Sequence, residues 1–334
     1  MSFSLDRIKL WSVGGGKGGI GKSIVTLGLG MSLARRGKKV ILIDCDLGGA
    51  NLHTLMGIRY PQVTLEHFLL KKVSRLEDTV IETPVAGIGL ICGADDILGA
   101  ANPTYSQKIR LLHQIEELPA PYVLLDLGAG TSFNLLDLFN YSAGKIVVFT
   151  SQTTSLQNAY GFIKSALFRK LSREFAKDEE VSNLLYQAGG SIAEENTASI
   201  AELLARLKGA APEKYARLCQ ALGDFQLFLI ANMVKGSGDL KSAEIIRSVC
   251  HDFLSIHPEI LGHVPYDSLV ETAVSQMTPF PQPGKKSKAV AGLEEIAARV
   301  VKEARLPRGR GNAPVDEAGL AMAGLLPQPC TSGS

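Results

Sequence analysis

Short, almost continuously hydrophobic segments alternate with segments of helical periodicity along the first 150 residues. The hydrophobic segments are 8–13, 39–44, 87–93, 122–127 and 145–150, and two more follow at 225–234 and 259–267. Strands that are hydrophobic on both faces are typical of a buried parallel sheet. Their alternation with helices predicts an α/β fold with a doubly wound, mostly parallel sheet.

Residues 176–222 depart from this alternation. Apolar positions recur there at helical spacing, with breaks expected at Gly189-Gly190 and at Gly209. We therefore predict a mostly helical insertion between two strands of the sheet.

The last part of the chain has a different composition. A final helix is predicted near 286–305, and the segment 306–334 that follows is rich in Pro, Gly and Ala. Such a segment is expected to be a flexible tail. The sequence thus predicts one domain over 1–305 and a tail over 306–334.

Composition places the chain among ordinary soluble globular proteins. It has 334 residues, of which 46% are hydrophobic and 20% charged, and a net charge of +2 requires neither nucleic acid nor a membrane as partner. No apolar run has the length of a signal-peptide core or a membrane span. The five cysteines form no CxxC pair, and the simplest interpretation is a reduced, cytoplasmic protein.

The glycine-rich segment after the first predicted strand has the spacing of a phosphate-binding loop, G-x-x-x-x-G-K-[ST]. Glycines let backbone N–H groups converge on a polyphosphate, and the helix that follows adds the positive end of its dipole. Lys22 would then neutralise the β- and γ-phosphates, and the Ser23 hydroxyl would bind Mg²⁺. The predicted nucleotide-binding residues of this loop are Gly16, Lys17, Gly18, Gly19, Ile20, Gly21, Lys22, Ser23 and Ile24.

Lys17 has no role within such a loop, because a side chain so early in it does not easily reach the same γ-phosphate. It could reach a phosphate bound to a facing subunit, in the way that arginine fingers act. The run KGGIGKS resembles the deviant Walker A motif, K-G-G-x-G-K-[ST], of the MinD/ParA class of P-loop ATPases. The resemblance implies a P-loop NTPase fold of the SIMIBI type, ATP and Mg²⁺ as ligands, and a homodimer formed around two ATP molecules. It also implies that Lys17 is the catalytic lysine that reaches across this dimer, beside the ordinary P-loop lysine, Lys22.

Two aspartates, Asp44 and Asp46, follow the second strand, where ligands bind in open α/β sheets. A carboxylate there can hold Mg²⁺-bound water or orient an attacking water. The segment IDCDLGGANLHTLMG resembles the switch I motif of the same family, D-x-D-x-G-x-x-N. This likeness implies that Asp46 positions the water near the metal and that Asp44 supports it. The alternative is a pair of strand-capping aspartates.

The segment VLLDLGAGTS places another aspartate, Asp126, at the end of a strand and before a mobile glycine turn. It resembles the switch II motif, D-x-[GA]-A-G. The resemblance implies that Asp126 contacts Mg²⁺ through water and that Gly130 senses the γ-phosphate.

Two late strands end in candidate adenine contacts. Asn232 can both donate to and accept from the adenine edge, and family members carry Asn or Arg at this place. The turn VPYDSLVETAV resembles the family's strand-to-helix turn, in which a proline lies against adenine, so Pro265 and Tyr266 are candidates there. For Asn232 the alternative is an ordinary turn residue.

The segments DLGGANLHTLMG, TSFNLLDLF and TTSLQNAYGFIKSAL resemble most closely those of the flagellar-number ATPases (FlhG/FleN), a MinD-like branch of the family. This resemblance implies a nucleotide switch that controls the position or number of a structure such as the flagellum or division site, with a regulatory protein partner and a possible peripheral membrane contact. The segment SLDRIKL does not match the D-Q-A-x-x-L-R motif of flagellar regulators. Residues 315–326 contain two acidic residues and no Lys or Arg, which favours a disordered tail over a lipid-binding helix.

Other functions remain as alternatives. A ParA-type partition ATPase would bind DNA through basic clusters such as 35–39, 71–75 and 285–288, and a slow ATP-binding scaffold would serve a protein partner. An iron–sulfur carrier of the Mrp type would need a C-terminal CxxC pair. A metalloenzyme is disfavoured because His251 and His257 are too far apart to share one helix face.

Overall fold

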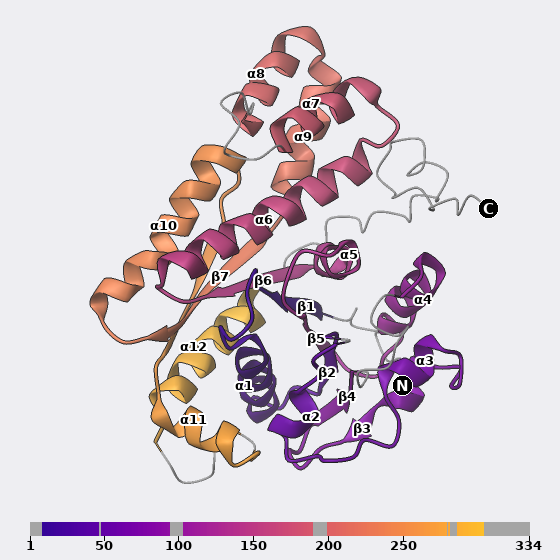
Figure 1. Ribbon diagram of the computed structural model, residues 1–334, viewed down its shortest axis with the longest axis vertical. Coiled ribbons are helices and arrows are strands. Elements are labelled where there is room, and N and C mark those ends of the chain that lie inside the picture. Colours follow the sequence, from indigo (N-terminus) through magenta and orange to yellow (C-terminus); the bar gives the residue numbers. More distant parts are fainter. Residues whose placement is uncertain are drawn as a thin grey trace, which may run out of the picture.

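A central sheet of eight strands organises the computed structural model, which describes residues 9–46, 48–93, 103–189, 199–278, 280 and 286–303 (Figure 1). The strand order is β3-β4-β2-β5-β1-β6-β7-β8; β3 pairs antiparallel with β4, and the other neighbours pair in parallel. The strands are β1 (Lys9–Gly14), β2 (Val40–Asp44), β3 (Ile81–Glu82), β4 (Ile88–Ile91), β5 (Tyr122–Asp126), β6 (Gly144–Phe149), β7 (Leu227–Val234) and β8 (Glu259–Pro265). The predicted fold class is therefore confirmed, and the short edge strand β3 is an addition that the hydrophobic pattern did not show.

Helices cover both faces of the sheet (Figure 1). On one face α1 and α12 pack together over one core cluster, and on the other α4, α5, α6 and α10 pack over a second. The helices are α1 (Lys22–Arg35), α2 (Leu52–Leu55), α3 (Leu65–Leu69), α4 (Tyr105–Ile115), α5 (Phe133–Tyr141), α6 (Thr153–Glu174), α7 (Glu179–Gly189), α8 (Ile200–Ala210), α9 (Pro212–Gly223), α10 (Ser237–Leu254), α11 (Ser268–Ser275) and α12 (Lys288–Glu303), with a 3-10 helix, η1, at Leu76–Thr79.

Successive strand residues enter the two core clusters in turn. Leu10 belongs to the cluster beneath α4, α5 and α6, whereas Trp11 belongs to the cluster beneath α1 and α12. Ile41, Leu42 and Ile43 alternate in the same way. Because side chains of a strand point to opposite faces, a sheet covered on both sides needs apolar residues at every position. This requirement explains the continuous hydrophobic segments in the sequence.

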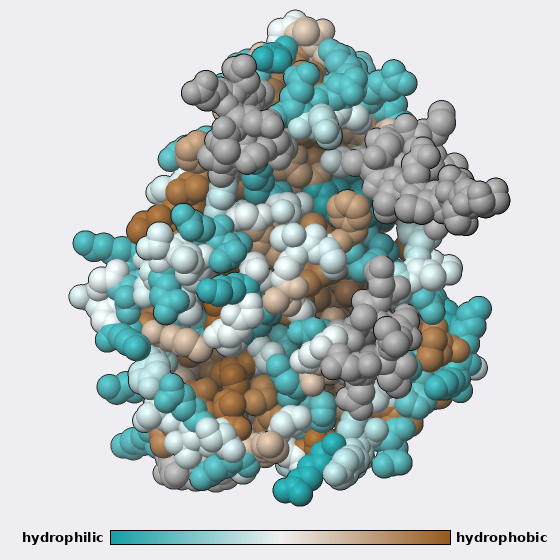
Figure 2. Space-filling view, in the orientation of Figure 1, coloured by the Kyte–Doolittle hydropathy of each residue, from teal (hydrophilic) through white to brown (hydrophobic). Residues whose placement is uncertain are grey.

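The predicted insertion at 176–222 is helical and consists of α7, α8 and α9, which stand beyond the ends of α6 and α10 (Figure 1). Polar side chains cover much of this part of the surface in the view of Figure 2. The break expected at Gly209 lies two residues further on, because α8 runs on to Ala210. The chain turns at Ala211, and Pro212 occupies the first turn of α9, where its missing N–H costs nothing.

The predicted final helix corresponds to α12. The tail predicted at 306–334 lies outside the described residues, so the division into a domain and a tail stays a prediction. Among the helices of the described residues, none combines the length and the apolar character that crossing a bilayer requires.

Candidate functional site

The register of three neighbouring strands brings the predicted loops to one edge of the sheet. Asp44, the last residue of β2, is paired with Asp126, the last residue of β5, and Val13 of β1 is also paired with Asp126. Parallel strands have their carboxyl ends on the same side. The glycine-rich loop after β1 and the two aspartates therefore meet at one place. Below, residues 44–51 are called the switch I loop and 126–131 the switch II loop.

The loop between β1 and α1 has the form of a phosphate cradle. Gly19 and Gly21 have φ angles of 77° and 83°, in the left-handed region that favours glycine. A Cβ atom built on Gly18 or Gly19 would meet nothing within 4 Å, so the space over the loop is open. The helix α1 begins at Lys22, and the N–H groups of its first turn are available to an anion. Lys22 Nζ crosses the loop and donates to the Lys17 carbonyl at 3.1 Å.

Close contacts from distant segments hold this loop in shape. A Cβ on Gly16 would lie 2.1 Å from the carbonyl oxygen of Asn158 in α6. On the other side, Asn232 Nδ2 donates to the Ile20 carbonyl at 2.8 Å, and a Cβ on Gly21 would lie 2.4 Å from that nitrogen. Asn232 thus fastens the loop, and its contact with adenine stays a prediction. The sequence showed no signal for Asn158, because the contact is made by its backbone.

We expect Gly16→Ala to lower the free energy of unfolding by about 1–3 kcal/mol, because the new methyl group overlaps backbone atoms of α6. Gly18→Ala is the matched control, since its methyl group would enter open space. Urea unfolding of both variants measures the difference. Equal stability of the two variants would contradict the close packing of the loop on α6.

Asp44 organises the switch I loop. Its carboxylate accepts hydrogen bonds from the backbone N–H groups of Asp46 at 3.1 Å, Asn51 at 2.9 Å and Leu52 at 3.0 Å. Burial raises the pKa of the Asp44 carboxyl to about 6, although these hydrogen bonds oppose the shift. The Asp44 carboxylate therefore holds the switch I loop together by these hydrogen bonds. It also adds negative charge to the buried part of the site.

Asp126 is the buried carboxylate closest to α1. It accepts a hydrogen bond from Thr26 Oγ1 at 3.1 Å, and the Ser23 hydroxyl also bonds to it. Burial, followed by the charge of Asp44, raises the pKa of the Asp126 carboxyl to about 7. Sequence reasoning missed Thr26, although it lies three residues after Ser23 and so on the same face of the helix.

Asp46 of the switch I loop contacts the switch II loop. A Cβ on Gly128 would be 2.9 Å from Asp46 Oδ1, so the carboxylate packs directly on the switch II backbone. Burial lowers the pKa of Lys22, while the charges of Asp126 and Asp46 act in the opposite direction. The two aspartates and the P-loop lysine are thus within electrostatic reach of each other.

The oxygen atoms of this site fit Mg²⁺. Ser23 and Asp126 offer a hydroxyl and a buried carboxylate that already contact each other, and Asp46 provides a further carboxylate nearby. Within the described ranges no group of three or more His, Cys, Asp or Glu is placed to hold a metal ion. Mg²⁺ binds through one or two carboxylates, substrate phosphates and its own water molecules, so the oxygen atoms of Ser23, Asp126 and Asp46 suffice for it.

The remaining candidates occupy the rim of the site. The Lys17 side chain is exposed, and Gly130 has a φ angle of 99° with open space around it. Pro265 ends β8 beside Val234 of β7, and Tyr266 follows with its ring 5.0 Å from the Lys235 ammonium. The structure brings the predicted adenine contacts to neighbouring strands, and their role in binding stays a prediction.

His251 and His257 do not share a helix, since α10 ends at Leu254. The chain turns at Ser255, which has a φ of 52°, and brings the two rings to a centroid distance of 4.8 Å. Spacing along the chain alone therefore misses this contact. The pair lies outside the site described above.

Two curated proteins show the relationship in sequence. Over 163 residues the chain is 27% identical to the antiactivator FleN of Pseudomonas aeruginosa, covering 48% of this chain and 57% of that protein. It is 30% identical over 163 residues to the flagellum site-determining protein YlxH of Helicobacter pylori, covering 47% of this chain and 53% of that protein. The matched part thus spans about half the length of these relatives.

A solved structure shows the relationship in fold. The septum site-determining protein MinD of Pyrococcus horikoshii, complexed with Mg-ADP, matches with a TM-score of 0.57 and 20% identity, covering 89% of this chain and 98% of that one. The family model described as the CobQ/CobB/MinD/ParA nucleotide binding domain matches residues 11–280. The chain therefore belongs to the CobQ/CobB/MinD/ParA family of nucleotide-binding domains.

Proposed function

We propose that this protein is an Mg²⁺-dependent ATPase that dimerises around two ATP molecules and acts as a switch controlling the position or number of a cellular structure. The observation that carries the proposal is the convergence of Lys22, Asp46 and Asp126 on one open phosphate cradle. The names of its relatives, an antiactivator and site-determining proteins, support the regulatory part.

Each residue of the site has a distinct task in hydrolysis. The loop N–H groups and Lys22 hold the β- and γ-phosphates, while Ser23 and Asp126 would hold Mg²⁺, which would neutralise charge on the phosphate oxygens. Asp46 orients a water molecule in line with the bond to the leaving ADP. The water attacks the γ-phosphorus, the bond to ADP breaks, and the water's proton leaves with the phosphate product or to solvent.

The contact of Asp46 with Gly128 gives hydrolysis a structural consequence. Loss of the γ-phosphate removes the group on which the two switch loops close, so both loops are released together. Lys17 is exposed outside the cradle and is free to approach a nucleotide bound to a second copy of the chain. ATP would thus favour the dimer, and hydrolysis the monomer.

Two variants test this proposal, and they should differ in whether ATP makes them dimerise. Asp46→Ala should bind ATP with near-normal affinity, lose about a hundredfold or more in hydrolysis rate, and accumulate as an ATP-bound dimer. Lys17→Ala should also bind ATP but remain a monomer. Light scattering after size exclusion, together with phosphate release, measures both. A Lys17→Ala protein that dimerises with ATP contradicts the cross-subunit role, and full hydrolysis by Asp46→Ala contradicts the assignment of the water-positioning residue.

The DNA-binding alternative has less support. Within the basic cluster 35–39, Arg35 forms an ion pair with Glu294 at 2.9 Å, and Arg36 donates to the Glu294 carbonyl at 3.0 Å. These arginines are therefore engaged with α12 of their own chain.

The peripheral membrane contact is tested by co-sedimentation of Asp46→Ala with anionic vesicles, in the presence of ATP and, separately, of ADP. A cytoplasmic location stays a prediction.

A further inference from the structure

One face of α6 contacts the phosphate loop at its beginning and α5 further along. Asn158, Phe162, Ala166, Arg169 and Arg173 are separated by four, four, three and four residues, so they form a single stripe. At 1.5 Å per residue the stripe extends over about 22 Å. A displacement at the beginning of the helix can therefore be transmitted to its end.

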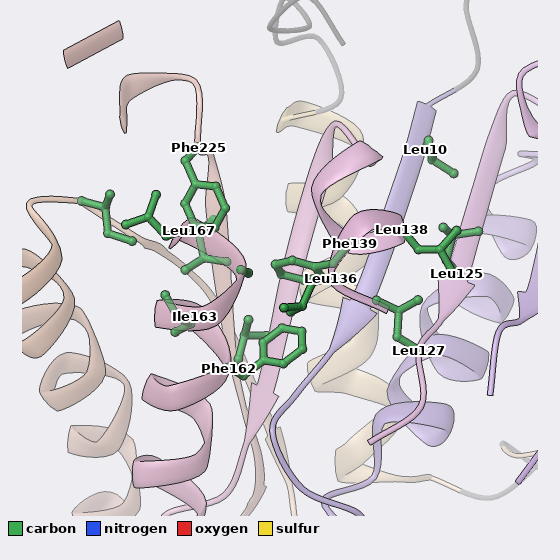
Figure 3. Close-up of a cluster of buried hydrophobic side chains, with 14 of the residues drawn as sticks. Leu10, Leu125, Leu127, Leu136, Leu138, Phe139, Phe162, Ile163, Leu167 and Phe225 are labelled. Atoms are coloured by element: carbon green, nitrogen blue, oxygen red, sulfur yellow. The ribbon is translucent and has the colours of Figure 1, made fainter. Parts of the chain in front are cut away.

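The first part of the stripe contacts the phosphate loop. The Asn158 backbone leaves no space for a Cβ on Gly16, and the Phe162 ring lies 2.8 Å from a Cβ position on Gly14. Phe162 also meets Phe139 of α5 edge-on, with ring centroids 4.9 Å apart (Figure 3). Because interiors are close-packed, a displacement of the loop must displace α6 or α5.

The last part of the stripe is fixed to Asp137 in the middle of α5. Arg169 donates two hydrogen bonds to the Asp137 carboxylate, at 2.9 and 3.1 Å, and Arg173 donates one at 3.1 Å. Lys108 of α4 forms a third ion pair with it. Phe133, one turn before Asp137, lies against the Arg169 guanidinium at 4.5 Å. We refer to Asp137, Lys108, Arg169 and Arg173 as the Asp137 clamp.

The ion pairs of the Asp137 clamp are buried, and this makes them costly to separate. The Asp137 side chain is 1% exposed. Burial alone would raise the pKa of its carboxyl, but the hydrogen bonds and charges of Arg169 and Lys108 hold that pKa below its ordinary value. The carboxylate therefore stays ionised, and separating it from its partners would leave buried charges unpaired. The helix α5 begins at Phe133, directly after the switch II loop, so the clamp connects the helix that follows this loop to α6.

The far end of α6 is held by the insertion. Arg217 of α9 donates to the Glu174 carbonyl at 3.4 Å and lies 4.8 Å from the centre of the Phe175 ring. Ser182 of α7 donates to the Phe175 carbonyl at 2.8 Å. Both α7 and α9 thus contact the chain at the end of α6.

From this continuous chain of contacts we propose that Asp137 is the positioning residue through which the nucleotide loops control the helical insertion α7–α9. Closing of the switch II loop on the γ-phosphate shifts α5, the clamp transfers the shift to α6, and the insertion follows the end of α6. This inference rests on the proposed function, since it needs a nucleotide whose γ-phosphate is present or absent.

Hydrogen exchange of the full chain, with Mg-ATPγS or Mg-ADP bound, tests the coupling. In the wild-type protein the amides of α7–α9 should differ about fivefold or more in exchange rate between the two nucleotides. In Asp137→Asn this difference should fall below about half of its wild-type value, while the nucleotide affinity stays within about threefold of that of the wild-type protein. If Asp137→Asn is unstable, Arg173→Gln provides the same test, with Arg173→Lys as the charge-preserving rescue.

Lys214→Gln is the matched control, because it breaks ion pairs with Asp178 and Glu180 inside the insertion and leaves the clamp intact. It should keep the nucleotide-dependent difference. A clamp variant that keeps the full difference overturns the inference, as does a wild-type protein that binds both nucleotides without any change in α7–α9. Absence of nucleotide binding by the wild-type protein would instead overturn the proposed function itself.

Discussion

Replacing Lys22 by alanine is expected to weaken ATP binding by about a hundredfold or more. Lys22 supplies the mobile charge of the cradle, and charge-assisted hydrogen bonds are worth about 1.5–3 kcal/mol each. Two such bonds to phosphate oxygens correspond to at least two powers of ten in affinity, at about 1.4 kcal/mol per tenfold change. Titration with a fluorescent ATP analogue in the presence of Mg²⁺ measures the loss.

The fold should tolerate this change. Lys22 is buried, burial lowers its pKa, and its ammonium donates a hydrogen bond to the Lys17 carbonyl. Because the pKa is lowered, desolvation of the Lys22 ammonium outweighs its attraction to Asp126 and Asp46, so removing it should cost little stability. The thermal midpoint of Lys22→Ala should therefore lie close to that of the wild-type protein, and Lys17→Ala should keep its affinity. An affinity of Lys22→Ala within about threefold of wild type would contradict the site.

Replacing Lys145 by methionine is expected to stabilise the protein by about 2–4 kcal/mol at pH 7. Lys145 is 4% exposed at the start of β6, and its ammonium donates to the Ser142 carbonyl at 2.6 Å. Burial, with a smaller contribution from Lys170, lowers its pKa from 10.5 to about 7. Methionine has a similar length and no charge to desolvate, so it removes this cost while losing one hydrogen bond.

The pH dependence of the stability gain shows whether burial of the Lys145 charge is its cause. Because the folded pKa of Lys145 is below its unfolded pKa, the unfolded chain binds more protons between pH 7 and 10.5. The cost of burying Lys145 is therefore greatest below pH 7 and declines as the pH rises, by about 1.4 kcal/mol per unit. The advantage of Lys145→Met should thus shrink by about 2 kcal/mol between pH 7 and pH 9.

Urea unfolding at the two pH values measures this change. Lys208→Met, on the exposed side of α8, is the matched control and should show neither effect. A Lys145→Met protein that is less stable than wild type at pH 7, or whose advantage is the same at both pH values, would show that the ammonium is well compensated in the folded state.

Much of the site could be predicted because its chemistry is local in the chain. The spacing Gly16-x4-Gly21-Lys22-Ser23 contains the turn, the helix start and the charge within eight residues, and the structure places α1 at Lys22. The strands before Asp44 and Asp126 were also visible, since a sheet covered on both faces requires continuous apolar segments.

The partners of these residues were not predictable in the same way. Thr26 could have been found from its helical spacing to Ser23, but for Asn232 the sequence indicates only an adenine contact or an ordinary turn residue, whereas its side chain donates to the Ile20 carbonyl. The side chain of Asn232 can serve either purpose; only the tertiary structure shows that it fastens the loop, and its contact with adenine stays a prediction. The break expected at Gly209 lies two residues further on, at Ala211, directly before the proline that begins α9.

The sequence by itself determined the class of the fold, the position of the phosphate loop and the identity of the charged groups around it. These features depend on residue type and on spacing over a few residues. The tertiary structure alone decided that α6 lies against Gly16, that Asp137 joins three cations from two other helices, and that Lys145 is cut off from water. Such contacts join residues far apart in the chain, and their energies depend on burial, which no local pattern contains.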